Sequence, residues 1–273
     1  MKTPKVSIVI PVYKPDEKVF EILKKRLKEQ TIKAEVIENW NMPEAISMNT
    51  GIKKAKGEIV VILPQDAVPK SKYWLERLIK PLSDKKVIAV VSDLYLPEEH
   101  WRNYSFLIKI LTLNERKKQF PKMDARGCAY RKKELVAAGM FDEDPKVIGI
   151  DTELYVKLKQ KGKIVRSNEI VFHMHRYDSA KKIIKNLYTY SEGNGKAIRK
   201  YGRKAGAFFK RISRAIPVWG VASIIYRFPW KRYFYLFPIY AVVAIPFIHI
   251  VNILGFWKGF FFPDKESDRN KVD

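Results

Sequence analysis

Two short apolar runs, separated by a helical pattern, restrict the fold of this chain more than any other feature. Residues 6–12 read VSIVIPV and residues 59–63 read IVVIL, so that apolar side chains occur on both alternations of each run. A strand with this pattern is buried on both faces, as in a parallel sheet that helices cover. Between the runs, residues 17–30 carry apolar side chains at helical spacing, namely Val19, Phe20, Leu23 and Leu27. This spacing predicts an amphipathic helix.

The same signals continue along the chain. They predict further strands at residues 35–38, 87–92, 127–131 and 164–172, and further helices at residues 45–55, 132–139 and 151–162. Alternation of strands and helices is typical of an α/β fold with a doubly wound, Rossmann-like sheet.

The charge of the chain is strongly positive and unevenly distributed. The formal net charge is +24, and residues 180–232 hold 14 Lys and Arg against one acid, Glu192. Such an excess points to a polyanionic surface, either nucleic acid or anionic lipid. Cys128 is the only cysteine, which excludes a disulfide or a thiolate zinc site within one chain and favours a reducing compartment. The apolar run at the N-terminus is too short for a signal peptide.

The last part of the chain is hydrophobic. Residues 215–226 are apolar but too few to span a bilayer, so we expect them at an interface or packed on the domain. Residues 233–257 contain no charged side chain over 25 positions, enough at about 1.5 Å per residue to cross roughly 30 Å of hydrocarbon. The alternative is a buried hairpin in a soluble protein, which Pro238, Pro246, His249 and Asn252 favour.

The flanks of this segment indicate its orientation. Arg227, Lys231 and Arg232 precede it, and the positive-inside rule then places the N-terminal domain in the cytoplasm, at the cell membrane. The expected organisation is an α/β domain over residues 1–179, basic amphipathic or interfacial helices over 180–232, a transmembrane helix over 233–257 and a polar tail over 258–273.

Polar residues that end buried strands are the first candidates for a site, because ligands of open α/β sheets bind beyond the carboxyl ends of the strands. Asp66 follows the apolar run 59–63. A carboxylate there can hold Mg²⁺ or Mn²⁺ and so neutralise a diphosphate leaving group. Taken alone, an Asp before Pro69 is also an ordinary turn residue.

Four segments in order resemble the family 2 glycosyltransferases with the GT-A fold. They are VSIVIPVYK at 6–14, SMNTGIKKAKGEIVVILPQDAVP at 47–69, RGCAYRKKELVAAGMFDE at 126–143 and GIDTELYVKLKQKGKIVRSNEIVFHMH at 149–175. The resemblance therefore extends over about 175 residues. It implies an inverting enzyme that transfers a sugar from a nucleotide to an acceptor.

The resemblance also implies a nucleotide-sugar site. Its residues are Pro11 and Tyr13 in the nucleobase pocket, Glu38 or Asn39 at the base or ribose, Asn49 and Gly51 supporting the nucleotide side of the cleft, and Gln65 with Asp66 from the metal-binding motif. Asp66 matches the metal-binding position of the family's Asp-x-Asp motif, whereas Pro64 replaces its first acid. The sequence Gln65-Asp66-Ala67 resembles a rhamnosyltransferase-like variant of that motif. The segment between Glu38 and Asn49 is shorter than in the family.

Two further roles follow from the resemblance. Asp151 corresponds to the catalytic base, although Ile150 replaces the acid that usually precedes it. Without the resemblance, Asp151 is equally a helix N-cap. His173 corresponds to a histidine that completes the metal site or touches the diphosphate, and His175 is the alternative. A structural histidine is the other interpretation of either residue.

The sequence thus predicts a metal-dependent glycosyltransferase at a membrane. The expected partners are a UDP- or dTDP-linked donor, divalent Mn or Mg, and a lipid-linked or saccharide acceptor, with no nucleic acid. Pro64 and Ile150 leave open a catalytically silent scaffold. The charge alone leaves open a nucleic-acid-binding membrane protein, although no RNA- or DNA-binding signature accompanies it.

Overall fold

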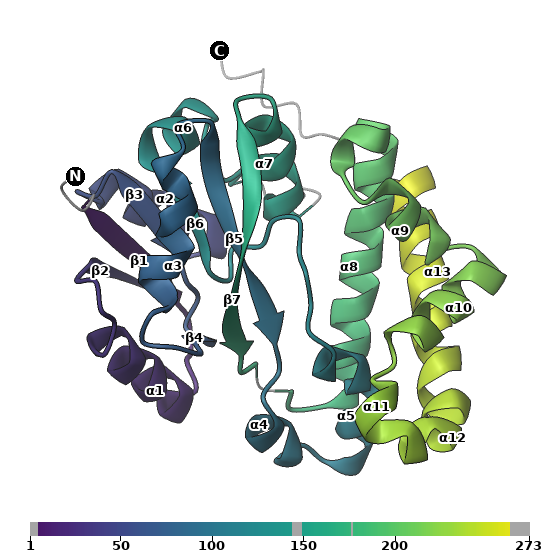
Figure 1. Ribbon diagram of the computed structural model, residues 1–273. Coiled ribbons are helices and arrows are strands. Elements are labelled where there is room, and N and C mark those ends of the chain that lie inside the picture. Colours follow the sequence, from purple (N-terminus) through teal and green to yellow (C-terminus); the bar gives the residue numbers. More distant parts are fainter. Residues whose placement is uncertain (1–4, 144–148, 176, 263–273) are drawn as a thin grey trace.

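A computed structural model of the protein describes residues 5–143, 149–175 and 177–262, which form a twisted sheet covered by helices and a second, helical layer (Figure 1). The strands are β1 (Val6–Val12), β2 (Glu35–Trp40), β3 (Ile59–Ile62), β4 (Ala67–Pro69), β5 (Val87–Tyr95), β6 (Cys128–Arg131) and β7 (Lys163–His173). They form one seven-stranded sheet in the order β2-β1-β3-β6-β5-β7-β4.

The sheet is mixed. β1 pairs in parallel with β2 and β3, and β5 pairs in parallel with β7. β6 lies antiparallel between β3 and β5, and β4 lies antiparallel to β7. The α/β prediction is confirmed, but the expectation of parallel strands is corrected for β6 and β4. After β5 the chain makes a long excursion and enters the sheet through β6 in the opposite direction.

Two hydrophobic cores lie on the two faces of the sheet, as the double alternation of β1 predicts. Ile8 and Ile10 point into the core beneath α1 (Glu17–Lys28) and α3 (Trp74–Ile79), whereas Val9 points into the opposite core. The helices over that opposite core are α2 (Glu44–Lys54), α6 (Lys132–Ala137) and α7 (Ile150–Lys159). β1 is buried along its whole length.

The predicted strands and helices are all present, with ends shifted by a few residues. The structure adds elements that the sequence patterns did not predict, namely β4, α3, η1 (Lys80–Ser83), α4 (Glu98–Arg102), α5 (Phe106–Leu111) and η2 (Leu113–Arg116). Each is six residues or shorter. Such lengths are too short for a periodic pattern to emerge.

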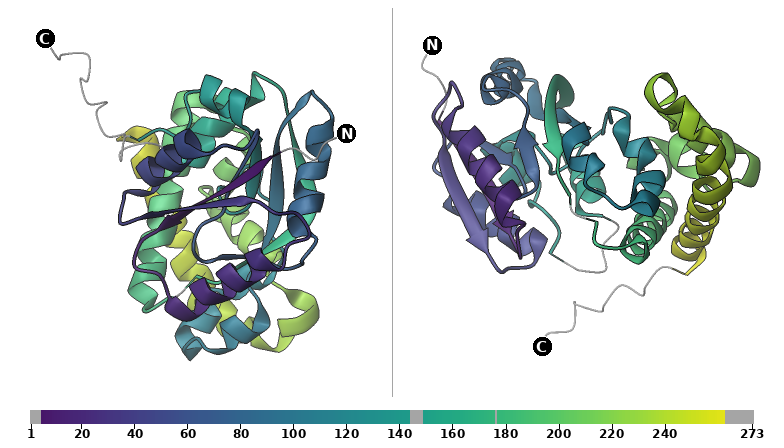
Figure 2. Two further views of the ribbon diagram at one scale, coloured as in Figure 1. Left: turned by 90° about the vertical axis from the view of Figure 1, so that its left-hand side faces the viewer. Right: turned by 90° about the horizontal axis from the view of Figure 1, so that it is seen from below.

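The helical layer follows β7. It comprises α8 (Ala180–Tyr201), η3 (Gly202–Ala205), α9 (Phe208–Ser213), α10 (Pro217–Arg227), α11 (Trp230–Tyr233), η4 (Phe234–Leu236), α12 (Phe237–Ile239), η5 (Tyr240–Ala244) and α13 (Ile245–Phe261). α8 runs beside the sheet domain, and α13 runs along α8 on its far side (Figures 1 and 2). The basic stretch 180–232 is therefore largely helical, as the sequence predicts.

The segment 233–257 lies within a helical run, Trp230–Phe261, that is long and apolar enough to cross a membrane. In its most apolar window, 39% is buried inside the protein. Tyr240, Ala244 and Ile248 share a core with Trp101 and Ile108 from α4 and α5. The inner side of the predicted span is therefore part of the protein core. Of the predicted polar tail, residues 263–273 lie outside the described residues.

Glycines set the distance between α8 and α13. A Cβ on Gly195 would overlap the carbonyl oxygen of Phe256, and a Cβ on Gly259 would overlap that of Glu192. The two backbones touch here, and Ser191 Oγ donates a hydrogen bond to Asn252 Oδ1 at 2.8 Å nearby. Because these contacts are with backbone, no rotamer change relieves them.

We expect Gly195→Ala to destabilise the protein by about 1–3 kcal/mol, the cost of overpacking a close contact. At roughly 2–4 °C per kcal/mol, thermal unfolding should move down by several degrees. Thr189→Ala, on the exposed side of α8, should leave the midpoint nearly unchanged. Equal midpoints for both variants would show that α8 and α13 are not packed as described.

Candidate functional site

The ends of β3 and β7 bring one acid and two histidines together. Asp66 follows β3, and β4 then pairs antiparallel with β7, with Ala67 opposite His173. The backbone N–H of Met174 donates to the carbonyl oxygen of Asp66 at 2.8 Å. Alternate residues of an extended chain point to the same side, so His173 and His175 both face the Asp66 side chain.

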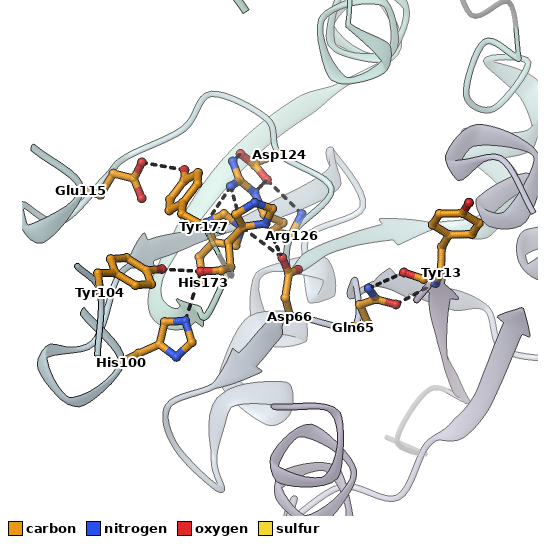
Figure 3. A network of polar contacts seen from close by, with 11 residues as sticks. Tyr13, Gln65, Asp66, His100, Tyr104, Glu115, Asp124, Arg126, His173 and Tyr177 are labelled. Atoms are coloured by element: carbon orange, nitrogen blue, oxygen red, sulfur yellow. Dashed lines mark hydrogen bonds and ion pairs between the residues drawn. The ribbon is translucent and has the colours of Figure 1, made fainter. Parts of the chain in front are cut away.

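These three side chains form a candidate metal centre (Figure 3). Asp66 Oδ2 lies 3.2 Å from His175 Nδ1 and 3.4 Å from His173 Nε2. One ligand atom from each residue lies within 4.8 Å of the other two. One carboxylate with two imidazoles suits Mn²⁺ better than Mg²⁺, since Mg²⁺ prefers oxygen ligands.

The histidines also control the charge of Asp66. Burial of its carboxylate opposes ionisation, but the attraction and hydrogen bonds of His173 and His175 outweigh burial and hold the pKa of Asp66 well below its usual range. Asp66 is therefore ionised at neutral pH, the state in which a carboxylate binds a cation.

Arg126 connects this centre to a second acid. Its guanidinium donates to both carboxylate oxygens of Asp124, at 2.7 and 2.6 Å, and its Nη1 lies 3.1 Å from His173 Nδ1. Asp124 is 8% exposed, so this bidentate pair is largely shielded from water. The segment Asp124–Arg126 precedes β6, which brings it to the edge of the candidate metal centre.

Asp151 lies on the other side of the same segment. Its Oδ1 accepts a hydrogen bond from the backbone N–H of Ala125 at 3.0 Å. The N-cap interpretation of Asp151 is wrong, because Gly149 occupies the N-cap of α7 and Asp151 is the second residue of the helix. Its carboxylate is thus held toward Asp124 and Arg126 rather than toward the end of its own helix.

The surroundings of Asp151 make it a stronger base. Burial and repulsion from Asp124 and Glu44 raise the pKa of Asp151 well above its usual range, and Arg126 opposes them only in part. The sequence has Ile150 where the family has a first acid. In the structure the second carboxylate near Asp151 comes instead from Asp124, which no sequence pattern singles out.

Gln65 joins the ends of β1 and β3. Its Oε1 accepts from the backbone N–H of Tyr13 at 2.7 Å, and its Nε2 donates to the Tyr13 carbonyl oxygen at 2.9 Å (Figure 3). The amide of Gln65 thus fixes the backbone of Tyr13, whose side chain is 58% exposed. Pro11 is buried within β1.

The remaining predicted nucleotide-site residues lie around α2. Asn39 is buried and donates to the carbonyl oxygen of Ser47, while Asn49 donates to that of Phe141 and accepts from its N–H. A Cβ on Gly51 would overlap Val9, so this glycine lets α2 approach β1. The Glu38 side chain accepts from Trp40 Nε1 at 3.1 Å. These contacts of Asn39, Asn49 and Gly51 hold α2 against β1, β2 and the Phe141 segment, and a role in nucleotide binding stays a prediction.

A network behind His175 was not predicted. Its carbonyl oxygen accepts from Tyr104 Oη and lies 3.1 Å from His100 Nε2, while Tyr177 Oη donates to Glu115 at 2.9 Å (Figure 3). Burial raises the pKa of Tyr104 far above its usual value, which keeps its hydroxyl protonated as the donor. Tyr104 and His100 thus fix the backbone of His175, and none of the four residues belongs to a recognisable motif.

Comparisons with known proteins agree with this architecture. Residues 14–138 match the family model "Glycosyl transferase family 2". No curated protein matches the chain. Among solved structures, it is similar to the mannosyltransferase PcManGT from Pyrobaculum calidifontis in complex with GDP-Man and Mn²⁺, with 17% identity, a TM-score of 0.62, and coverage of 97% of this chain and 89% of that chain.

Two other solved structures are more distant. TarS 1–349 from S. aureus in complex with UDP-GlcNAc has 14% identity, a TM-score of 0.44, and coverage of 94% of this chain and 90% of that one. GalNAc-T7 with UDP, GalNAc and Mn²⁺ has 12% identity, a TM-score of 0.48, and coverage of 77% of this chain and 54% of that one. At 17% identity, the likeness to the mannosyltransferase concerns the fold, which is GT-A-like.

Proposed function

We propose that this chain, whose residues 14–138 match the model of glycosyltransferase family 2, is an inverting enzyme that moves a sugar from a nucleoside diphosphate to a lipid-linked acceptor at a membrane. The observation that carries the proposal is one connected group of polar side chains. Asp66, His173 and His175 lie at one end, and Asp151 at the other, with Asp124 and Arg126 joining them.

The Asp66 end of this group fits a divalent cation. A bound Mn²⁺ would neutralise the negative charge that builds on the departing diphosphate. Asp66, His173 and His175 would hold the ion. Arg126, between this cluster and Asp124, is placed to donate hydrogen bonds to phosphate oxygens, which its planar fork suits. Tyr13, with its backbone fixed by Gln65, would contact the nucleobase.

At the acceptor end, Asp151 would act as general base. An inverting transfer is a single in-line displacement, in which the attacking hydroxyl loses its proton to a nearby base as the new glycosidic bond forms. The bond between the anomeric carbon and the diphosphate breaks in the same step. A carboxylate with a raised pKa takes this proton more readily than an ordinary one.

The membrane part of the proposal comes from the helical layer. Basic residues of 180–232 are suited to an anionic leaflet. Trp219, Tyr226 and Trp230 are exposed beside them, as aromatic residues are at membrane interfaces. An enzyme held there meets acceptors that are anchored in lipid, with its catalytic domain on the cytoplasmic side.

The test is a donor panel. Purified protein with Mn²⁺ should hydrolyse or transfer from one of UDP-, dTDP- and GDP-linked sugars, the last included because the mannosyltransferase structure holds GDP-Man. NMR of the product should show an inverted anomeric centre. Binding of a donor without turnover would favour the catalytically silent scaffold. Tight, salt-sensitive DNA binding without donor binding would favour the nucleic-acid-binding protein.

The pH dependence of sugar transfer tests whether Asp124 raises the pKa of Asp151. Asp151 must be deprotonated to accept a proton, so activity should rise as pH increases through its raised pKa. Asp124→Asn removes the repulsion and leaves Arg126 free to attract Asp151, while Glu44 is unchanged. Both effects lower the pKa of Asp151, and the acid limb of the kcat/KM profile should move to lower pH. In Asp124→Glu the acid limb should return to its wild-type pH. An acid limb that did not move in Asp124→Asn would contradict the electrostatic effect of Asp124 on Asp151.

A further inference from the structure

The outer side of the helical layer carries an apolar stripe. From η4 to α13, exposed apolar side chains recur at intervals of three to seven residues, at Tyr235, Val242, Phe247, Ile250 and Leu254, each between 54% and 77% exposed. On the neighbouring α10, Val218, Trp219 and Tyr226 are between 64% and 78% exposed. We call these eight residues the apolar face. Its helices lie on the side of α8 that faces away from the sheet (Figures 1 and 2).

The inner side of the same helices packs against the rest of the protein. Ile245 and Ile248 pack in a core that includes Ile183 of α8 and Ile224 of α10. Gly255 and Gly259 place α13 directly on the backbone of α8. α13 therefore cannot enter a bilayer alone, because its removal would expose this core to water.

α8 cannot accompany α13 across a bilayer either. Glu192 forms ion pairs with Lys196 and with Lys258, both at 3.3 Å, and Arg199 donates to the Phe260 and Phe261 carbonyl oxygens. Charged side chains within the hydrocarbon are costly and rare. The contacts along α8 and α13 thus disfavour a membrane-spanning pair.

Cations lie beside the apolar face without acidic partners. Among the described residues, no carboxylate forms an ion pair with Lys210, Arg214, Arg227 or Lys231. Burial, with repulsion from Arg214, Arg227 and Arg211, lowers the pKa of Lys210 to about 8. Within the part of the chain that the structure describes, the buried Nε of Arg214 has no hydrogen-bond partner. Such a cluster is complementary to phosphate groups.

We propose that the apolar face lies in the plane of an anionic membrane surface and does not cross it. The apolar side chains enter the boundary between headgroups and acyl chains, as interfacial helices do, and the cations meet lipid phosphates. A groove of about 500 Å³ between α8 and the end of α13, lined by Tyr188, Leu254, Trp257 and Lys258 among others, can receive part of an acyl chain. This goes beyond the proposed reaction, which requires only that the acceptor be within reach.

Sedimentation with lipid vesicles tests the surface without any need for transfer activity. The protein should bind vesicles that contain phosphatidylglycerol, and Ile250→Glu with Leu254→Glu should weaken binding at least tenfold. Val136→Glu changes an exposed apolar residue of α6 and should bind like the wild type. Lys210→Gln with Lys231→Gln should weaken binding to anionic vesicles but not to neutral ones. Circular dichroism checks that each variant is folded.

Cysteine labelling from outside the vesicles distinguishes the interfacial arrangement from a membrane-spanning one. The native Cys128 is buried, so Lys28→Cys on α1 and Ser267→Cys, which follows α13 in the sequence, provide single reactive sites. When the protein is bound to vesicles, both should react with a membrane-impermeant maleimide. Protection of one site until detergent is added would show a spanning helix and overturn the proposal. If the wild-type protein did not bind vesicles but formed dimers, and the Ile250→Glu, Leu254→Glu variant did not dimerise, the apolar face would be a contact between two copies of the chain and the proposal would be wrong.

Discussion

Replacing Asp151 by Asn should abolish nearly all transfer while leaving the donor bound. The substitution keeps the size of the side chain, and its Oδ1 can still accept from the Ala125 N–H that holds it in place. What it removes is a proton acceptor whose pKa burial and Asp124 raise. Loss of a general base costs about 10²–10⁴-fold in rate, and kcat should fall by this factor. The dissociation constant of the nucleotide sugar, measured by calorimetry with Mn²⁺, should change little.

Asp84→Asn is the matched control, because Asp84 is an exposed carboxylate that accepts from a backbone N–H, that of Lys86, and is not part of the polar group around Asp151. It should retain full activity. If Asp151→Asn transferred sugar at the wild-type rate, the proton would be leaving by another route, and the role of Asp151 as base would be wrong. If both the wild type and Asp151→Asn bound the donor without turnover, the scaffold alternative would replace the enzyme.

The sequence predicted the structure of a segment well where that structure depends on the residues of the segment alone. The strands β1 and β3 are buried on both faces, and the β-branched residues on both alternations indicate this directly. The pairing partners of a strand depend on contacts far along the chain. No local pattern distinguishes the antiparallel β6 from a parallel strand, and so the expectation of a parallel sheet was wrong for this strand.

The same distinction applies to the site. Asp66 and His175 are 109 residues apart in sequence, and only the order of the family motifs suggested that they meet. Gln65 matched a motif position, but its two hydrogen bonds to the backbone of Tyr13 depend on where β1 and β3 end. Asp124 is not part of any of the family motifs found in the sequence. Its importance comes from the bidentate pair with Arg126 and from its charge beside Asp151, both of which require the folded chain.

The metal centre should bind Mn²⁺ more tightly than Mg²⁺ and lose most of this affinity when one ligand is removed. Two imidazoles and one carboxylate within 4.8 Å of one another form a donor set that favours Mn²⁺. Loss of an outer partner of a metal ligand already costs about 10–100-fold in affinity. We therefore expect His173→Ala, His175→Ala and Asp66→Asn each to weaken Mn²⁺ binding by at least about 100-fold, as followed by the paramagnetic resonance signal of the free ion.

In all three variants, sugar transfer should decrease in parallel with the loss of Mn²⁺ affinity. A chelator should abolish transfer by the wild type until Mn²⁺ is restored. His249→Gln is the control, since His249 lies on α13, far along the chain from the cluster, and should bind Mn²⁺ as the wild type does. Wild-type Mn²⁺ affinity in His175→Ala but not in His173→Ala would leave His175 a structural residue, held through its carbonyl oxygen by Tyr104. Unchanged affinity in Asp66→Asn would place the cation elsewhere and remove the basis of the donor site.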